Sequence, residues 1–167
     1  MGKIMSIKIS DKTKCTGCYA CQNVCPIDCI SMKEDISGFV YPVVDNSRCV
    51  ECKKCERVCP VSGTEVSVNA SKVVFAAWSN DMDIRYNSTS GGVFSELAYG
   101  VIGEGGSVAG AVYSDENVIK HAVVSKNSDI EKVRQSKYAQ SEINNVYREI
   151  SNFLKHRKVL FCGTPCQ

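Results

Sequence analysis

Eight of the eleven cysteines in this 167-residue chain lie in two runs with the same spacing. Each run reads C-x-x-C-x-x-C-x-x-x-C-P, and the two consist of Cys15, Cys18, Cys21 and Cys25, and of Cys49, Cys52, Cys55 and Cys59. Cysteine thiolates are the usual ligands of iron–sulfur clusters, and a [4Fe-4S] cluster takes four of them. The two runs therefore predict two [4Fe-4S] clusters and a chain that handles electrons.

The fourth cysteine of each run predicts how the ligands are shared. In bacterial ferredoxins with this run, the fourth cysteine ligates the other cluster. Cluster one would then have the ligands Cys15, Cys18, Cys21 and Cys59, and cluster two the ligands Cys49, Cys52, Cys55 and Cys25. The proline after each fourth cysteine disfavours a helix there. Crossed ligation would tie the two runs together, so that folding and cluster binding would be coupled.

Disulfide bonds and zinc are the alternative uses of so many cysteines. Disulfides need an oxidising compartment, and residues 1–10 lack the apolar segment of a signal peptide. Zinc is often bound by C-x-x-C pairs, but zinc sites seldom use three evenly spaced cysteines followed by C-P. The pattern therefore favours iron–sulfur clusters, and cysteines of this kind are expected in a reducing cytoplasm.

The composition is that of a chain with a packed core. Hydrophobic residues make up 44% of the sequence, and the net charge is only +2, which gives no reason to expect a nucleic-acid partner. No apolar run approaches the roughly 18 residues of a membrane span.

An internal repeat defines the first domain, which we expect over residues 1–65. Residues 15–26 align with residues 49–60 at an offset of 34. Ile30–Met32 and Phe39–Val44 have the pattern of short strands, with Gly38 in the turn between them. A domain this small has little apolar core, so two bound clusters would stabilise it by linking its segments.

Residues 66–71 are polar and small and predict a linker, and residues 72–167 differ in character. Strands are expected at Lys72–Trp78, Ser107–Tyr113, Val118–Val124 and Lys158–Cys162. Helices are expected over Val93–Ile102, after a capping box at Ser128–Glu131, and along an apolar face from Ile143 to Leu154. Strands that alternate with helices predict an α/β second domain. The expected fold class of the whole chain is therefore α+β.

Four segments of this second region resemble a known family when they are taken in order. They are Ser90–Ser95 (SGGVFS), Gly110–Tyr113 (GAVY), Ser136–Ser141 (SKYAQS) and Gly163–Gln167 (GTPCQ). The series resembles the coenzyme F-420 hydrogenase/dehydrogenase β-subunit family, whose bacterial members often carry an N-terminal dicluster ferredoxin domain. The resemblance covers essentially the whole chain but only the front part of the family's catalytic domain, an α/β flavoprotein-type domain. We therefore expect an N-terminal fragment that lacks turnover of its own.

The resemblance implies an FAD cofactor and a redox partner, either a partner protein or the flavin domain itself. It places Ser90, Gly91 and Gly92 at the flavin, together with Gly163, Thr164 and Pro165. It also makes Cys166 a possible further cluster ligand, whose partners would lie downstream. The Ser90–Gly92 turn has free N–H groups that could accept a phosphate. An ordinary helix N-cap with a close helix contact is the alternative for this turn. No catalytic residue is assigned.

The remaining candidates have simpler interpretations. Cys29 is expected to be a buried residue that does not bind a cluster, because the ligand sets are complete without it. Cys162 is expected to pack as a small apolar residue in its strand. His121 could act as a general acid or base, but a packed or solvated role is favoured for both His121 and His156.

Two functions follow from these features. The first is the iron–sulfur portion of a flavin-dependent oxidoreductase, in which two clusters exchange electrons with an FAD-type flavin. The second is a dicluster ferredoxin that only carries electrons, with residues 72–167 as a docking domain.

Overall fold

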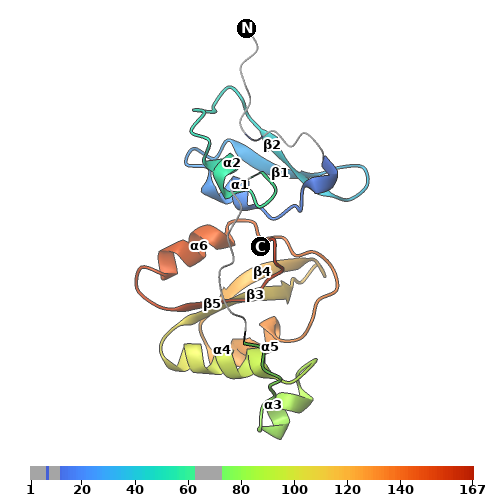
Figure 1. The fold of residues 1–167 in the computed structure, drawn as a ribbon, viewed down its shortest axis with the longest axis vertical. Coiled ribbons are helices and arrows are strands. Elements are labelled where there is room, and N and C mark those ends of the chain that lie inside the picture. Colours follow the sequence, from blue (N-terminus) through green and yellow to red (C-terminus); the bar gives the residue numbers. More distant parts are fainter. Residues whose placement is uncertain (1–6, 8–11, 63–72) are drawn as a thin grey trace. The chain divides into compact units, whose positions relative to one another are not determined.

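A computed structural model of the chain describes Ile7 and residues 12–62 and 73–167. These residues form two compact units, of which the second ends at Gly163 and the first also includes Thr164–Gln167, and each is described by itself (Figure 1). The predicted linker at residues 66–71 lies outside the described residues. Both units mix short helices with small sheets, which confirms the predicted α+β class.

The first unit combines one hairpin with three short helical segments. They are η1 (Lys12–Lys14), α1 (Ala20–Val24), β1 (Ile30–Glu34), β2 (Val40–Val44) and α2 (Lys54–Val58). The strands pair antiparallel from Ile30 opposite Val44 to Glu34 opposite Val40. Gly38 closes the turn between them at φ +82°, a conformation that glycine adopts without strain. The predicted strands and their turn are therefore confirmed.

The internal repeat of the sequence is also a repeat of the backbone. Helix α1 follows Tyr19 and helix α2 follows Lys53, two residues that are both left-handed, with φ of 63° and 58°. Each helix ends at the fourth cysteine of its run, where Cys25 and Cys59 have extended ψ values of 116° and 121°. The proline that follows favours this extended conformation. The same local chemistry therefore builds two similar loop–helix segments.

Cysteine side chains form much of the interior of the first unit. Its buried cluster consists of Ile7, Cys21, Cys25, Cys29, Ile30 and Cys55. Four of these six residues are cysteines, which is the composition expected of a small domain that ligands hold together.

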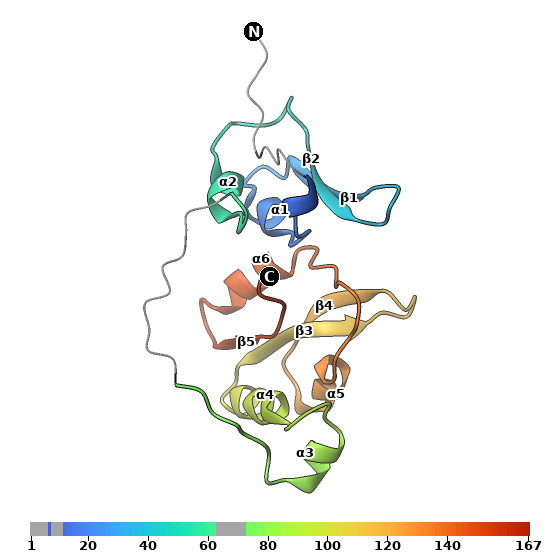
Figure 2. The same cartoon turned by 45° about the vertical axis from the view of Figure 1, so that its right-hand side comes forward.

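The second unit is a three-stranded sheet with helices on both faces (Figure 2). Its elements are α3 (Met82–Tyr86), α4 (Val93–Gly103), β3 (Ser107–Tyr113), β4 (Ile119–Val124), η2 (Asn127–Asp129), α5 (Ile130–Val133), α6 (Val146–Phe153) and β5 (Val159–Phe161). The strand order is β4-β3-β5, with β3 antiparallel to β4 and parallel to β5. Helices α4 and α5 cover one face and α6 lies on the other. The sheet is therefore mixed.

The core of the second unit lies under α4 and α5. It consists of Ala98, Val108, Val112, Val124, Ile130 and Val133. Alternate residues of β3 point into this core, as the period of a strand requires. Gly110 lies between the two β3 valines, and a Cβ there would meet the Val133 side chain at 3.3 Å. Helix α5 can therefore pack closely against the strand.

Four of the elements predicted in this region are confirmed and one is wrong. Strand β3 has the predicted bounds, and α4, β4 and β5 begin and end within a residue of theirs. The described part of the segment predicted as a buried strand at Lys72–Trp78 has no regular structure, and Val74 and Phe75 there are 88% and 81% exposed. An apolar run becomes a strand only when a neighbouring strand pairs with it. No described strand pairs with residues 73–78.

Two further details of the prediction are corrected. The capping box at Ser128–Glu131 does not form: the N-cap of α5 is Asp129, and its side chain makes no cap hydrogen bond. Asp129 instead pairs with Lys132 at 2.8 Å. The apolar face predicted from Ile143 to Leu154 is helical only from Val146, although Ile143 is fully buried in the preceding loop.

Candidate iron–sulfur sites

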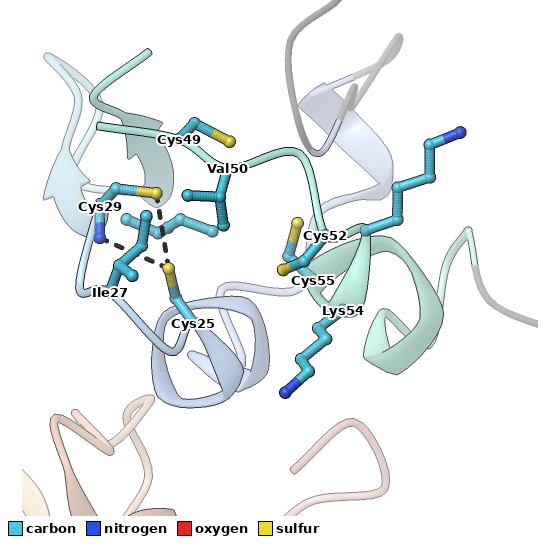
Figure 3. Close-up of a pocket in the computed structure, with 10 residues that line it drawn as sticks. Cys25, Ile27, Cys29, Cys49, Val50, Cys52, Lys54 and Cys55 are labelled. Carbon is cyan, nitrogen blue, oxygen red and sulfur yellow. Dashed lines mark hydrogen bonds between the residues drawn. The ribbon is translucent and has the colours of Figure 1, made fainter. Parts of the chain in front are cut away.

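Cysteines from both runs line one cavity of the first unit (Figure 3). Cys49, Cys52 and Cys55 of the second run line it, together with Cys25, the fourth cysteine of the first run. Cys29 and Ile27 complete the side next to Cys25. These four run cysteines are the ligand set that the crossed pattern predicts for cluster two.

A second cavity of the first unit has the reciprocal composition. Cys15, Cys18 and Cys21 of the first run line it, together with Cys59, the fourth cysteine of the second run. Met32 and Pro42 of the hairpin form another side. The structure thus brings together the four cysteines predicted for cluster one.

Four cysteines of the two runs line each of the two cavities. Among residues 7, 12–62 and 73–167, no group of three or more histidine, cysteine or carboxylate side chains could hold one metal ion. Zinc draws four ligands to one centre. In a [4Fe-4S] cluster each iron takes its own thiolate. Four thiols spread around a cavity fit this second requirement.

Hydrogen-bond donors surround the sulfur of Cys25. Burial alone would raise its pKa, but the N–H groups of Cys29 and Ile27 and the Cys29 thiol outweigh burial and lower the pKa of Cys25. The N–H of Cys29 lies 3.4 Å from the Cys25 sulfur. Donors of this kind stabilise a thiolate, the form that binds iron.

Cys59 has a matching set of donors. Burial again acts against the shift, but the Ser62 hydroxyl and the N–H groups of Val61 and Ser62 lower the pKa of Cys59. Val61 corresponds to Ile27 at the repeat offset of 34. Each fourth cysteine therefore has two N–H donors and one side-chain donor. The sequence repeat alone did not identify these contacts.

Other cysteines of the two cavities behave as buried thiols. Burial, and next the charge of Cys18, raise the pKa of Cys21 to about 12. Burial likewise raises the pKa of Cys15 and of Cys55. A metal replaces the thiol proton on binding, so such thiols would lose protons as a cluster binds.

Cys29 is 5% exposed, which confirms the predicted burial. Its sulfur lies 3.5 Å from the sulfur of Cys25. Burial, and next the hydrogen bond to Cys25, raise the pKa of Cys29 to about 12, which keeps the thiol protonated. Cys29 can therefore donate its S–H to Cys25.

The Ser90–Gly92 turn packs tightly against its own chain. Gly92 is the N-cap of α4 at φ +82°, and a Cβ there would meet Ile84 at 3.0 Å. A Cβ on Gly91 would lie 2.5 Å from the Ala77 carbonyl oxygen. Both glycines are therefore explained by local packing, which is the alternative that the sequence left open for this turn. A role at a flavin stays a prediction.

The Gly163–Gln167 segment forms a closed turn. The N–H of Gln167 donates to Thr164 O at 2.9 Å, and the N–H of Thr164 donates to the Gln167 side chain at 3.0 Å. The Thr164 hydroxyl lies 3.2 Å from the Cys166 sulfur.

The expectation that Cys162 packs inside its strand is wrong, because Cys162 is exposed and follows the last residue of β5.

His121 joins three segments of the second unit. Its Nε2–H donates to Cys162 O at 3.0 Å, and its Nδ1 accepts the Ser141 hydroxyl at 2.7 Å. Its ring stacks on Phe161 with centroids 5.3 Å apart. Burial lowers the pKa of His121, which favours the neutral ring that these bonds require. The predicted packed role of His121 is confirmed, and His156 is exposed.

Comparisons with known proteins identify the class of each unit. Residues 14–62 match the 4Fe-4S dicluster domain. Residues 74–148 match the N-terminal domain of the coenzyme F420 hydrogenase/dehydrogenase beta subunit. One part of the chain is therefore similar to iron–sulfur dicluster domains and another to the N-terminal part of this beta subunit, which confirms the predicted resemblance.

A second 4Fe-4S dicluster model matches residues 41–98, a range that contains only the second cysteine run. The search of curated proteins finds no match. The longest described helix, α4, has eleven residues, and none of the described helices is long and apolar enough to cross a membrane.

Proposed function

We propose that the first unit holds two [4Fe-4S] clusters by crossed ligation. Cluster one would be bound by Cys15, Cys18, Cys21 and Cys59, and cluster two by Cys49, Cys52, Cys55 and Cys25. The observation that carries this proposal is the composition of the two cavities. Each is lined by three cysteines of one run and the fourth cysteine of the other.

The residues of the chain have distinct roles in this proposal. The clusters supply one-electron transfer when bound. The thiolates hold the iron, and the donors around Cys25 and Cys59 stabilise the negative charge on sulfur. Such hydrogen bonds favour the more negative, reduced state and so raise the reduction potential.

We further infer that the clusters exchange electrons with an FAD-type flavin in a reducing cytoplasm. The match of residues 74–148 to a hydrogenase/dehydrogenase beta subunit supports this step and suggests a partner subunit. Ser90, Gly91, Gly92, Gly163, Thr164 and Pro165 are the proposed flavin contacts. A flavin converts single electrons into two-electron chemistry. The chain would then be the electron-transfer portion of an oxidoreductase.

A stand-alone electron carrier is the second candidate. The packing of Gly91 and Gly92 against residues 77–84 favours it, because that packing accounts for both glycines without a flavin. In this case the second unit would dock a redox partner and perform no catalysis.

Anaerobic reconstitution tests the cluster proposal. The full chain should bind about eight irons and eight sulfides, because two [4Fe-4S] clusters contain that number. Iron and acid-labile sulfide are measured per chain, with zinc measured in parallel. A chain that takes up zinc and no sulfide would contradict the proposal.

A further inference from the structure

The loop after Cys25 needs a support of its own. It holds the two N–H groups that point at the Cys25 sulfur, those of Ile27 and Cys29. Asp28 between them has a left-handed φ of 51°, a conformation that few residues other than glycine, asparagine and aspartate adopt. A loop with this conformation keeps its donors in place only if its surroundings hold it.

Arg48 provides this support from the other cysteine run. Its Nη2 donates to Ile27 O at 2.7 Å, and its Nη1 reaches Asp28 O at 3.5 Å. Arg48 directly precedes Cys49, so one side chain connects the segment of Cys49 to the segment of Cys25. Both cysteines line the same cavity. The planar guanidinium presents several donors in a rigid fork, and a lysine cannot reproduce that geometry.

A short turn fixes the position of Arg48. The Arg48 N–H donates to Asp45 O at 3.3 Å, and the Asp45 N–H donates to Cys29 O at 2.8 Å. The Asp45 side chain accepts from the Ser47 N–H at 3.0 Å and from the Ser47 hydroxyl at 2.6 Å. The loop after Cys25 is thus held at Ile27 by the arginine and at Cys29 by the backbone.

We propose that Arg48 is the positioning residue of the cluster-two site. It joins the loop after Cys25 to the start of the second cysteine run, and it thereby keeps the Ile27 and Cys29 N–H groups directed at the Cys25 sulfur. This inference rests on the proposed crossed ligation. It assigns Arg48 a specific effect on one of the two clusters.

The internal repeat supplies a matched position for comparison. Lys14 precedes Cys15 as Arg48 precedes Cys49, and Val61 corresponds to Ile27. Within the described residues, the Lys14 side chain forms no hydrogen bond to the loop after Cys59. The arginine support is therefore specific to the second site.

The test uses the reconstituted full chain and the variants Arg48→Gln, Arg48→Lys and Lys14→Gln. Each is challenged anaerobically with an iron chelator, and iron is counted over time. Arg48→Gln should lose about half of its iron roughly ten- to a hundredfold faster than the wild-type chain, the range typical of lost outer-shell contacts. The other half should leave at the wild-type rate. Lys14→Gln should behave like the wild-type chain.

The reduction potential gives a second readout. The shifted β-proton signals of Cys49, Cys52 and Cys55 should report a lower midpoint potential in Arg48→Gln, because the cluster loses directed N–H donors. Those of Cys15, Cys18 and Cys21 should not move. Arg48→Lys keeps the positive charge but lacks the planar guanidinium with its several donors. It should therefore resemble Arg48→Gln in both the rate of iron loss and the midpoint potential.

The inference would be overturned if the Arg48→Lys chain behaved like the wild-type chain. It would also be overturned if the Arg48→Gln chain lost all of its iron at a single rate, or lost iron no faster than the wild-type chain. A wild-type chain that fails to bind two clusters would instead contradict the proposed function itself.

Discussion

The sulfur atoms of Cys25 and Cys29 lie 3.5 Å apart in the interior of the first unit. The first belongs to a cysteine run and the second does not. Burial keeps the Cys29 thiol protonated, with a pKa of about 12, so its S–H can donate to the Cys25 thiolate. At the other fourth cysteine, Cys59, the Ser62 hydroxyl makes the corresponding bond. Cys29 and Ser62 are therefore equivalent as hydrogen-bond donors.

Replacing Cys29 tests whether it is a donor or a ligand. Cys29→Ser should keep about eight irons per chain, because both proposed ligand sets remain complete. Cys29→Ala should also keep them, but it should lower the midpoint potential of cluster two, since the side-chain donor is lost. Iron analysis and potentiometric titration check both results. A loss of half the iron in either variant would make Cys29 a ligand.

Crossed ligation predicts which signals change when Cys25 is replaced. In Cys25→Ser, the β-proton signals of Cys49, Cys52 and Cys55 should shift or disappear, because these cysteines share its proposed cluster. The signals of Cys15, Cys18 and Cys21 should persist. Paramagnetic NMR of the reconstituted chain measures both sets. The opposite pattern would mean that each run binds its own cluster.

The sequence predicted the first unit well, because its structure follows from local chemistry. The spacing of the cysteines, the prolines after Cys25 and Cys59, and the glycine at position 38 act over a few residues each. Pairing of β1 with β2 likewise needs only a short turn. The thiol and hydroxyl donors to Cys25 and Cys59 were not predicted, because Cys29 and Ser62 do not align at the repeat offset.

The features that the sequence did not predict depend on tertiary contacts. Residues 73–78 have a strand-like composition, but no described strand pairs with them. The exposure of Cys162 depends on where β5 ends, which the apolar pattern does not specify. The contact of Arg48 with Ile27 joins residues 21 positions apart, and a basic residue before a cysteine gives no sign of it. Burial of His121 depends on β5 and on the loop that holds Ser141.

The His121 bonds predict a specific pH dependence of stability. Burial holds the pKa of His121 below the ordinary value of about 6.5, so the unfolded chain binds the proton more readily. Neutral His121 should contribute fully to the free energy of unfolding above about pH 6.5. This contribution should decrease as the pH falls through the pKa of His121 in the folded chain. Thermal unfolding of the full chain between neutral and mildly acidic pH measures this change.

Two variants separate this effect from acid damage elsewhere. His121→Gln should be less stable at neutral pH and should lose part of the pH dependence. His156→Gln is the matched control, because His156 is exposed, and it should unfold like the wild type. An unchanged pH dependence in His121→Gln would contradict the assignment.

Gly91 and Gly100 should respond in opposite directions to the same substitution. Gly91→Ala should destabilise the second unit by about 1–3 kcal/mol, because its Cβ would lie 2.5 Å from the Ala77 carbonyl oxygen. Gly100 lies inside α4 with nothing within 4 Å of its Cβ position. Gly100→Ala should stabilise the unit by roughly 0.5–1 kcal/mol. Thermal unfolding compares the two, and a neutral Gly91→Ala would contradict the close packing of the turn.

FAD titration tests the proposed flavin contact at the N-terminus of α4, and Ser90 is the position to change. Ser90 is exposed just before the N-cap of α4, and a carboxylate near a helix N-terminus is compatible with the helix dipole. Ser90→Glu should therefore keep the fold but repel the flavin pyrophosphate, weakening FAD binding several-fold, whereas Ser90→Gln should bind like the wild type. Flavin fluorescence quenching measures all three chains. Equal binding by Ser90→Glu would exclude the α4 N-terminus as the phosphate site.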